Sequence, residues 1–474
     1  MRGLTQAALV LTAVSPAFAS LPPIVKKGST LVDSSTNQRF AIIGVDYQPG
    51  GSSGAGTGNG DPLSDGVACL RDAVLMQKLG VNTIRIYNID PTLNHDLCMS
   101  IFDAAGIYVI LDVNSPLSGQ YLDRSNPAGT YNSGYMSHVF NVIEAFKGYT
   151  NILGFFAGNE IINDVPTAGP NPPYIRAIQR DMKNYIAKHA KRSIPVGYSA
   201  ADVDTILQDN WEYLQCDNGD SSSSDFFGLN SYSWCGGDAT YESAGYNKLV
   251  AMFAPTTIPI FFSEYGCNLV APRVFDEVQA LYGPNMTLLS GGLVYEWSQE
   301  GNDYGLVTIN SNASLNLGGD YMNLLAQYNK IDVGLIQAAN NSAESATAPK
   351  CASKLISNSG FNNSFSIPSP PAGVQALINN GVTGAPTGAF ASVTATTVTQ
   401  GVFNTNGVAL KNLVLKMSSN ANTPSNATIS GASSGTSASS TSSPTASKAA
   451  APSSHVVAAG GLIAGFIGVL AAIL

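Results

Sequence analysis

The sequence is poor in charge, in tryptophan and in histidine. Charged residues make up 12% of the 474 positions, and there are only 3 Trp and 4 His, whereas an average soluble domain is ~25% charged. The formal net charge of −9 argues against nucleic acid or an anionic membrane surface as a partner. The His residues are scattered and no Cys-x-x-Cys pair occurs, so we expect no metal site and no cofactor. Apolar residues reach 44%, enough for a large core, which excludes a wholly disordered chain.

The N-terminus has the pattern of a secretory signal peptide. Arg2 is followed by an apolar stretch that leads to Ala17-Phe18-Ala19, a small-x-small motif of the kind that signal peptidase cleaves. We therefore expect residues 1–19 to be removed after Ala19. The alternative is a first core helix, which Pro16 near its end disfavours.

The C-terminus has the pattern of a glycosylphosphatidylinositol (GPI) anchor signal. Residues 456–474 are uncharged and apolar, and residues 418–455 before them are rich in Ser, Thr, Ala and Pro. A small-residue site, a polar spacer and an apolar tail predict an anchor, with removal of the tail; the candidate attachment residues are Ser447, Ala449 and Ala450. The protein would lie on the outer face of the plasma membrane, with the cell wall as a second location, and 418–455 would form a disordered, O-glycosylated stalk. A tail-anchored helix is the alternative, which a signal peptide on the same chain disfavours.

Cysteines and glycosylation triplets agree with secretion. An even number of cysteines suggests disulfides in a secreted chain, and the number alone leaves their pairing open. The six cysteines are Cys69, Cys98, Cys216, Cys235, Cys267 and Cys351. Asn-x-Ser/Thr triplets, which are compatible with N-glycosylation, begin at Asn285, Asn312, Asn340, Asn362 and Asn426.

Apolar, β-rich runs alternate with amphipathic segments between about residues 39 and 300. The runs that read as strands are 40–46, 81–87, 107–113, 152–157, 194–198, 225–230, 259–263 and 292–297. The helix-like segments between them include 69–79, 96–105, 136–147, 174–189 and 273–281. Apolar strands separated by helices indicate a parallel sheet covered on both faces, and eight units in about 260 residues predict an α/β fold, the (β/α)8 TIM barrel. A doubly wound open sheet is the runner-up, but the glycine-rich run Gly50–Gly60 lacks the Lys-Ser/Thr of a phosphate loop.

The regular alternation stops after about residue 332. We therefore expect a barrel domain over residues 20–332 and a small non-barrel extension over 333–417. Pro-rich turns and Thr/Val-rich runs in the extension are compatible with a small β-appendage or with a segment that wraps around the barrel.

Two glutamates stand at the ends of predicted strands, where the reacting groups of such barrels lie. Glu160 closes the fourth strand in the stretch Phe155–Glu160, and Glu264 closes the seventh in the stretch Phe261–Glu264. A single Glu after an apolar run is more often an ion-paired or capping residue, but two of them, with Asn159 before the first, are harder to explain structurally. The fourth and seventh strands face each other across the barrel mouth, and retaining glycosidases need two carboxyls about 5–5.5 Å apart. The pattern favours a retaining glycosidase.

The chain from about residue 26 to residue 330 resembles glycoside hydrolase family 72, the GPI-anchored β-1,3-glucanosyltransferases of fungal cell walls. The segments that carry the resemblance span the barrel. They are Gly44–Gly50, Asn82–Tyr87, Leu111–Asn114, Phe156–Glu160, Pro195–Ser199, Phe262–Cys267 and Gly291–Glu300.

The resemblance implies a role for each matching residue. Glu160 matches the acid/base, Glu264 the nucleophile, and Asn159 the residue that hydrogen-bonds the sugar 2-hydroxyl. The residues that match groups lining the glucan subsites are Gln48, Tyr87, Asp112, Asp202, Tyr232, Tyr295 and Tyr304. Simple packing at the barrel rim is the alternative for each tyrosine, although a ring face suits sugar C–H groups while its hydroxyl hydrogen-bonds. The family usually has Arg five residues after the position of Asp202, where this chain has Leu207.

The predicted fold suggests how the cysteines pair, and the resemblance implies the same pairs. One pair falls on consecutive helices, one follows the sixth and seventh strands, and the remaining pair would tie the extension back to the barrel. The expected disulfides are Cys69–Cys98, Cys235–Cys267 and Cys216–Cys351.

We therefore predict a retaining β-1,3-glucanosyltransferase that elongates cell-wall glucan, with β-1,3-glucan as both donor and acceptor. Neither step of the double displacement needs a metal or a cofactor. A retaining endo-β-glucanase with the same residues is the first alternative, and a non-catalytic glucan-binding wall protein is the second. The sequence does not indicate an oligomeric state.

Overall fold

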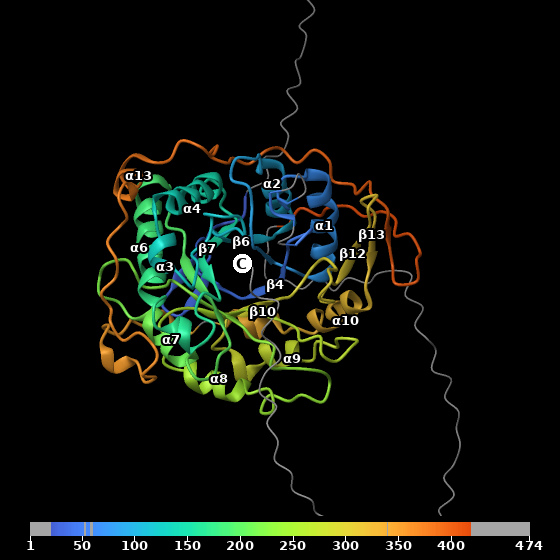
Figure 1. The fold of residues 1–474 in the computed structure, drawn as a ribbon. Coiled ribbons are helices and arrows are strands. Elements are labelled where there is room, and N and C mark those ends of the chain that lie inside the picture. The colour runs from blue at the N-terminus through green and yellow to red at the C-terminus, as the bar shows by residue number, and fades with distance from the viewer. Residues whose placement is uncertain (1–19, 52–53, 57–59, 339, 419–474) are drawn as a thin grey trace, which may run out of the picture.

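The computed structural model describes residues 20–51, 54–56, 60–338 and 340–418 (Figure 1). A parallel sheet closes into a barrel where its last strand pairs with its first, so the prediction of a (β/α)8 barrel is confirmed. The barrel strands are β4 (Ile42–Asp46), β5 (Thr83–Ile86), β6 (Tyr108–Asp112), β7 (Ile152–Asn159), β8 (Val196–Ala201), β9 (Phe227–Asn230), β10 (Ile260–Tyr265) and β11 (Gly291–Val294).

Helices surround the barrel and connect its strands (Figure 1). The longer ones are α1 (Gly66–Leu79), α2 (Asp96–Ala105), α4 (Ser133–Phe146), α6 (Pro172–His189), α7 (Leu207–Gln215), α8 (Tyr246–Phe253) and α10 (Gly319–Tyr328), and shorter ones are α3 (Pro127–Thr130), α5 (Val165–Ala168), α9 (Glu277–Leu281) and η2 (Pro284–Met286). Local sequence sets their ends. Asp65 caps α1 by accepting the backbone N–H groups of Val67 and Ala68, and Gly80 ends that helix with a left-handed φ of 91°.

The sequence patterns predict neither α7 nor α8, and the predicted helix over 273–281 is wrong for its first half. Helix α9 begins only at Glu277. The backbone before it is held by side chains of α10 instead of by helical hydrogen bonds. Asn323 donates to the carbonyl of Arg273, and Gln327 donates to that of Val274. Tertiary contacts therefore override the helical periodicity of this segment.

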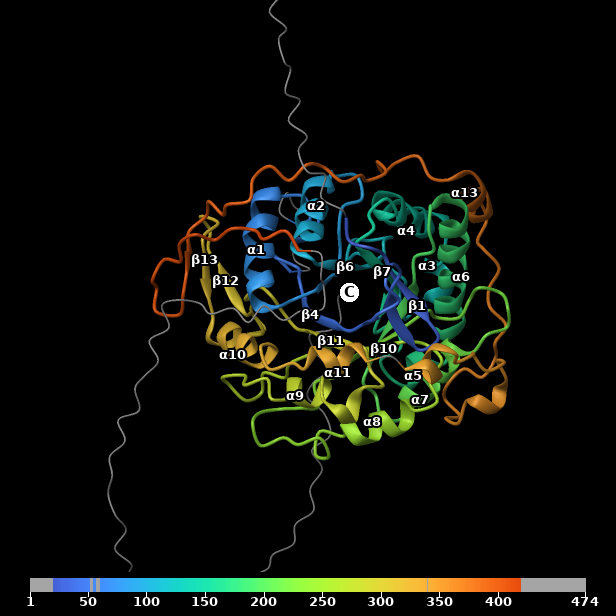
Figure 2. The ribbon, with the colours of Figure 1, turned by 180° about the vertical axis from the view of Figure 1, so that it is seen from behind.

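An N-terminal hairpin closes one end of the barrel, which we call the floor (Figure 2). It consists of β1 (Ile24–Lys27), β2 (Thr30–Asp33) and β3 (Arg39–Phe40), paired in antiparallel order. Its apolar side chains join residues at the starts of the barrel strands in one buried cluster. The floor cluster is Leu21, Ile24, Leu31, Phe40, Ile42, Tyr108, Ile110, Leu153, Phe156, Phe226, Phe261 and Leu293. Gly154 and Gly197 make room for Phe226, because a Cβ at Gly197 would lie 2.4 Å from its ring.

The extension after residue 332 combines both expected forms. It contains α11 (Val333–Gln337), α12 (Asn341–Glu344), η3 (Ser353–Leu355), α13 (Val374–Asn380) and β14 (Val402–Phe403). Helix α13 packs on α4 and α6, and the chain then passes around the outside of the barrel towards α1 (Figure 1). Strand β14 joins β13 (Leu315–Leu317), which pairs with β12 (Val307–Ile309). A small sheet therefore links the extension to chain that precedes residue 332.

Three disulfides join the pairs that the sequence analysis expected: Cys69–Cys98, Cys216–Cys351 and Cys235–Cys267. The first connects α1 to α2. The second ties the extension to the chain just after α7, and the third joins the loops that follow β9 and β10.

The predicted glycosylation sites lie partly within the described residues, whereas the predicted signal peptide and anchor signal lie outside them. Asn285, Asn312 and Asn340 are exposed, and Asn362 is half-buried with its amide donating to the carbonyl of Gly169. The signal peptide (1–19), the stalk beyond residue 418, the tail (456–474) and the single positions Asn426, Ser447, Ala449 and Ala450 lie outside the described residues. Within the described part of the chain, no helix combines the length and the apolar character needed to span a bilayer.

Candidate active site

The two glutamates lie at the C-terminal ends of the barrel strands, the end that we call the mouth. Glu264 is the fifth residue of β10 and is 8% exposed. Glu160 directly follows β7, is half-buried, and has a left-handed φ of 48°. That conformation is unfavourable for a residue with a Cβ and is often found at functional positions. A continuous series of hydrogen bonds joins the two carboxyls.

Three donors hold the carboxylate of Glu264. Its Oε1 accepts from Arg85 Nη1 at 3.1 Å and from the hydroxyl of Tyr87 at 2.9 Å, and its Oε2 accepts from the hydroxyl of Tyr232 at 2.7 Å. Burial raises the pKa of Glu264; the Arg85 cation opposes this, the negative Glu160 adds to it, and the two tyrosine hydrogen bonds again lower the pKa. The donors therefore offset part of the cost of keeping this buried carboxylate charged.

Arg85 links the carboxyls at the mouth. Its guanidinium is fully buried, pairs with Asp112 through Nε (2.9 Å) and Nη2 (3.2 Å), and also donates from Nη2 to Asn159 Oδ1 at 3.0 Å. It lies between the rings of Tyr87 and Phe156, at 4.3 and 4.6 Å from their centroids. Arg85 has no role among the sequence predictions. Its lone charge within the apolar run 81–87 is the signal that could have found it, because it lies two residues before Tyr87 and so on the same strand face.

Asn230, also without a role in the sequence analysis, completes the connection. It is the last residue of β9, and its Nδ2 donates to Asn159 Oδ1 at 3.1 Å and to Glu160 Oε1 at 2.8 Å. The hydrogen-bonded series therefore runs from Glu264 through Arg85, Asn159 and Asn230 to Glu160. Residues of four strands or their ends are held in one network.

Four tyrosines form an aromatic wall beside Glu264. Tyr295 packs edge-on against Tyr87, Tyr232 and Tyr304, with centroid separations of 6.2, 6.4 and 5.2 Å, and Tyr232 contacts Tyr304 at 5.6 Å. These are the four tyrosines expected to line glucan subsites. Rings with hydroxyl groups can pack on sugar C–H faces and hydrogen-bond sugar hydroxyls.

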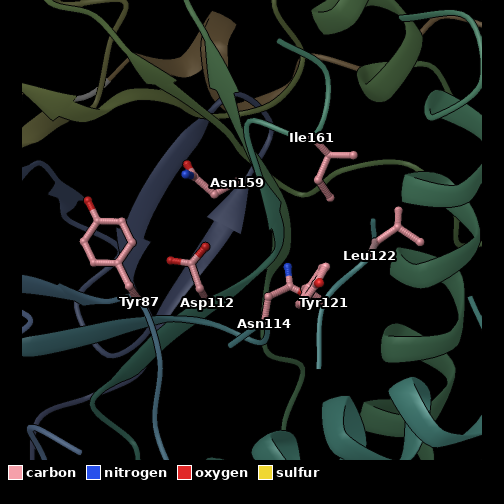
Figure 3. A pocket seen from close by; sticks show the side chains of 7 residues that line it. All are labelled: Tyr87, Asp112, Asn114, Tyr121, Leu122, Asn159 and Ile161. Atoms are coloured by element: carbon pink, nitrogen blue, oxygen red, sulfur yellow. The ribbon is translucent and has the colours of Figure 1, made fainter. Parts of the chain in front are cut away.

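A cavity opens beside this wall at the ends of β5, β6 and β7 (Figure 3). Asp112 and Asn159 lie between Tyr87 on one side and Ile161 and Leu122 on the other. Its complete lining is Tyr87, Asp112, Asn114, Tyr121, Leu122, Asn159 and Ile161. Tyr121 and Leu122 of this lining belong to the loop after β6, and Ile161 belongs to the loop after β7. The strand patterns in the sequence do not indicate these three residues.

Gln48 and Asp202 stand apart from the glutamate network. Gln48 is buried, and its Oε1 accepts the backbone N–H groups of Tyr87 and Asn88, so it holds the end of β5 against the loop after β4. Asp202, after β8, accepts from the hydroxyl of Ser231 at 2.8 Å. Leu207, where the resembled family usually has Arg, is 2% exposed at the start of α7 and packs in the core.

Two further buried acids lie close to the network. Asp46, at the end of β4, is fully buried and neither of its carboxyl oxygens has a hydrogen-bond partner among the described residues. Glu296 is 3% exposed and accepts from Asn302 Nδ2 at 2.9 Å. Burial raises the pKa of Asp46 well above its ordinary value and raises the pKa of Glu296 to about 8. Burial therefore favours the uncharged form of both acids, which limits the negative charge around Glu264.

Metal ligands do not gather here: among the residues that the structure describes, no three His, Cys, Asp or Glu side chains are placed to hold a metal ion. The chemistry available at the mouth is that of two carboxyls, their hydrogen-bond donors and a wall of tyrosines. One buried carboxylate and one half-buried carboxyl on facing strands suit nucleophilic and acid/base roles.

The chain is similar to known proteins over most of its length. The family model described as "Glucanosyltransferase", glycoside hydrolase family 72, matches residues 13–332. The chain is 57% identical over 415 residues to "1,3-beta-glucanosyltransferase gel2" of Aspergillus fumigatus, which covers 87% of each protein. It is 50% identical over 379 residues to "Probable 1,3-beta-glucanosyltransferase GAS3" of Saccharomyces cerevisiae, which covers 77% of this chain and 72% of the relative.

Solved structures agree with these relatives. Saccharomyces cerevisiae Gas2p in complex with laminaripentaose superposes with a TM-score of 0.67 at 37% identity, covering 74% of this chain and 78% of that one. The family resemblance inferred from the barrel motifs is therefore confirmed: the chain belongs to the glucanosyltransferase family, glycoside hydrolase family 72.

Proposed function

We propose that this protein is a retaining 1,3-β-glucanosyltransferase, which cleaves an internal bond of one β-1,3-glucan and transfers the new reducing end to another. The observation that carries the proposal is the hydrogen-bonded connection between Glu160 and Glu264 at the barrel mouth. Family membership supports the reaction, and the laminaripentaose complex of Gas2p supports a β-1,3-glucan substrate.

In the first step Glu264 attacks the anomeric carbon while Glu160 donates its proton to the glycosidic oxygen. The bond from the anomeric carbon to that oxygen breaks, the leaving glucan departs with the proton, and an ester joins the sugar to Glu264. Arg85 and the hydroxyls of Tyr87 and Tyr232 hold the carboxylate for attack.

In the second step Glu160, now a carboxylate, removes the proton from the 3-hydroxyl of an acceptor glucan. The acceptor oxygen attacks the anomeric carbon, the ester to Glu264 breaks, and Glu160 regains its proton. Two inversions at the same carbon retain the β-configuration. Water in place of the acceptor would give hydrolysis. The aromatic wall favours transfer over hydrolysis, because its rings offer binding surface to a sugar and little to water.

The test is to incubate the purified protein with borohydride-reduced laminari-oligosaccharides and to measure the sizes of the products. Products longer than the starting material require transfer. Exclusively shorter products would identify an endo-β-glucanase, and absence of turnover would identify a glucan-binding wall protein; either result overturns the proposal.

We also propose that a signal peptide over residues 1–19 directs the protein to the secretory pathway. A GPI anchor then holds the protein on the outer face of the plasma membrane, from which it reaches cell-wall glucan. The support is the small-residue site, polar spacer and apolar tail before and within residues 456–474. Deletion of 456–474 should release active protein into the medium, while the full chain stays with the membrane until phospholipase C treatment. Membrane retention of the truncated protein would contradict the anchor.

A further inference from the structure

Asn230 makes four hydrogen bonds at the end of β9. Its Oδ1 accepts from the hydroxyls of Ser199 at 3.0 Å and Ser263 at 2.8 Å, and its Nδ2 donates to Asn159 and Glu160. The side chain is 3% exposed. Both hydrogen bonds of its NH2 group therefore go to Asn159, the last residue of β7, and to Glu160 directly after it.

Neighbouring strands are shaped to hold this amide. Ser199 lies on β8 and Ser263 on β10, so the two hydroxyls approach Asn230 from both sides of β9. Gly228 on β9 allows the approach of β10, because a Cβ at this position would lie 2.6 Å from Ser263 Oγ. The amide is therefore fixed by packing before a substrate arrives.

The contacts also fix which way each amide faces. A guanidinium only donates hydrogen bonds, so the atom of Asn159 that meets Arg85 must be its oxygen. The edge of Asn230 that meets this oxygen must then be its NH2 group, and Glu160 Oε1, which meets the same NH2 group, accepts. Asn159 Oδ1 receives hydrogen bonds from both Arg85 and Asn230. The oxygen of Asn159 is thereby turned towards the network, and its own NH2 group is left for the cavity that this residue lines.

We propose that Asn230 is a positioning residue that prepares two groups at once, an inference that rests on the function proposed above. It keeps Glu160 Oε1 as a hydrogen-bond acceptor, so that Oε2 carries the proton delivered to the glycosidic oxygen. Together with Arg85 it also holds the Asn159 amide with its NH2 group facing the sugar 2-hydroxyl. Asn230 itself does not touch the substrate.

The first test compares two donors on the Asn230→Ala variant. A laminari-oligosaccharide needs a proton on its leaving oxygen, whereas a dinitrophenyl β-laminarioside does not. If Asn230 orients Glu160, the rate on the oligosaccharide should fall by on the order of tenfold more than the rate of dinitrophenolate release. Because both rates come from one preparation, their ratio does not depend on the folded fraction, and Asn230→Ser serves where the alanine variant yields no soluble protein.

The matched control is Asn151→Ala. Asn151 is also fully buried, but its amide donates to the carbonyls of Met99 and Ile107 before the start of β7, at the floor end of the barrel. This variant should lower the melting temperature and leave the ratio of the two rates unchanged. An equal fall on both donors in Asn230→Ala would overturn the role assigned to Asn230 at Glu160. Absence of wild-type activity on laminari-oligosaccharides would instead overturn the proposed function.

The second test addresses Asn159. A dinitrophenyl donor that lacks the 2-hydroxyl on the reacting sugar offers Asn159 nothing to bind. On this donor Asn230→Ala should leave the rate of dinitrophenolate release unchanged, whereas on the parent donor it should lower that rate. Equal losses on the 2-deoxy and parent donors would overturn the role assigned to Asn230 at Asn159.

Discussion

The two ends of the barrel are filled by opposite kinds of side chain, although the same strands supply both. At the floor, β4 begins with Ile42 and β6 with Tyr108, which join the apolar cluster under the hairpin. At the mouth, the same strands end with Asp112, which pairs with Arg85, and with Asp46, whose pKa the Arg85 cation lowers against the effect of burial. Phe156 marks the boundary, because its ring packs on Phe226 and Phe261 towards the floor and under Arg85 towards the mouth.

This difference separates stability from chemistry. Apolar burial at the floor stabilises the fold without directional requirements, whereas the charges at the mouth cost free energy to bury and are retained by hydrogen bonds in fixed directions. Substitutions at the mouth should therefore change activity more than stability, and substitutions at the floor should do the reverse.

The largest effect is expected at the two glutamates. Glu264→Gln removes the nucleophile and Glu160→Gln removes the proton donor, so each should lower transfer between laminari-oligosaccharides by about 10⁴-fold. Melting temperatures should stay near that of the wild type, because both changes conserve shape. The measurement pairs a product assay with thermal unfolding.

Azide distinguishes the two roles. With an activated donor, Glu160→Gln should accumulate the glycosyl-enzyme, from which azide releases a β-glycosyl azide. Glu264→Gly leaves space on the opposite face of the sugar, so azide should give the α-anomer. An exchange of the two anomers between the variants would mean that the roles assigned to Glu160 and Glu264 are reversed.

A floor substitution should give the opposite result. Leu31 is fully buried in the floor cluster on β2, so Leu31→Ala should lower the free energy of unfolding by about 2–5 kcal/mol. Urea denaturation measures this loss. The kcat/KM of the folded protein should be unchanged; a tenfold fall would show that the floor and the mouth are not separable.

The sequence predicts the barrel strands and the two glutamates better than it predicts the contacts at the mouth, and it does not predict the hairpin that closes the floor. Runs of apolar residues locate each barrel strand, and the strand ends locate Glu160 and Glu264, because these features are local. Arg85 and Asn230 were not predicted, because their partners lie on other strands. Arg85 on β5 hydrogen-bonds to residues of β6, β7 and β10, and Asn230 on β9 hydrogen-bonds to residues at β7, β8 and β10. The barrel register that creates these contacts cannot be read from spacing along the chain.

An arginine outside the glutamate network supports the aromatic wall. Arg273 is 3% exposed and pairs with Asp320 at 2.6 Å. It donates to the backbone carbonyls of Gly266 at 3.2 Å, Tyr295 at 2.7 Å and Tyr304 at 2.5 Å. One side chain thus holds the loop after Glu264 and two residues of the wall in a common position.

Arg273→Lys should loosen the wall, because an ammonium group cannot reproduce the planar fork of donors. We expect KM for laminari-oligosaccharides to rise about tenfold, with a smaller change in kcat. Arg176→Lys is the matched control: this buried Arg donates to the carbonyls of Tyr213 and Cys216, remote from the mouth. The control should lose thermal stability and keep its KM; an equal rise in both variants would contradict the support of the wall by Arg273.

The smallest expected effect is a change of melting temperature with pH, to which one carboxyl at the mouth and one near the floor contribute. Burial raises the pKa of Glu296 at the mouth to about 8 and that of Asp103, which accepts from the backbone of Leu21 near the floor, to about 6. A carboxyl with a raised pKa holds its proton in the folded state after the unfolded chain has lost it. Its contribution to stability is therefore complete below the unfolded pKa and is lost as pH rises through the folded pKa.

The pH ranges of the two carboxyls overlap below pH 6, and of these two only Glu296 still lowers stability above pH 6. Between about pH 6 and pH 8 the wild-type melting temperature should fall by a few degrees, and Glu296→Gln should reduce this fall. It should not abolish it, because burial also raises the pKa of Glu277 to about 7. Asp103→Asn should leave the decline above pH 6 intact and reduce the decline between about pH 4 and pH 6, to which Glu296 and Glu277 also contribute. Melting curves at half-unit pH intervals measure both slopes, and a fall above pH 6 that is the same in Glu296→Gln as in the wild type would mean that Glu296 is already ionised in the folded protein.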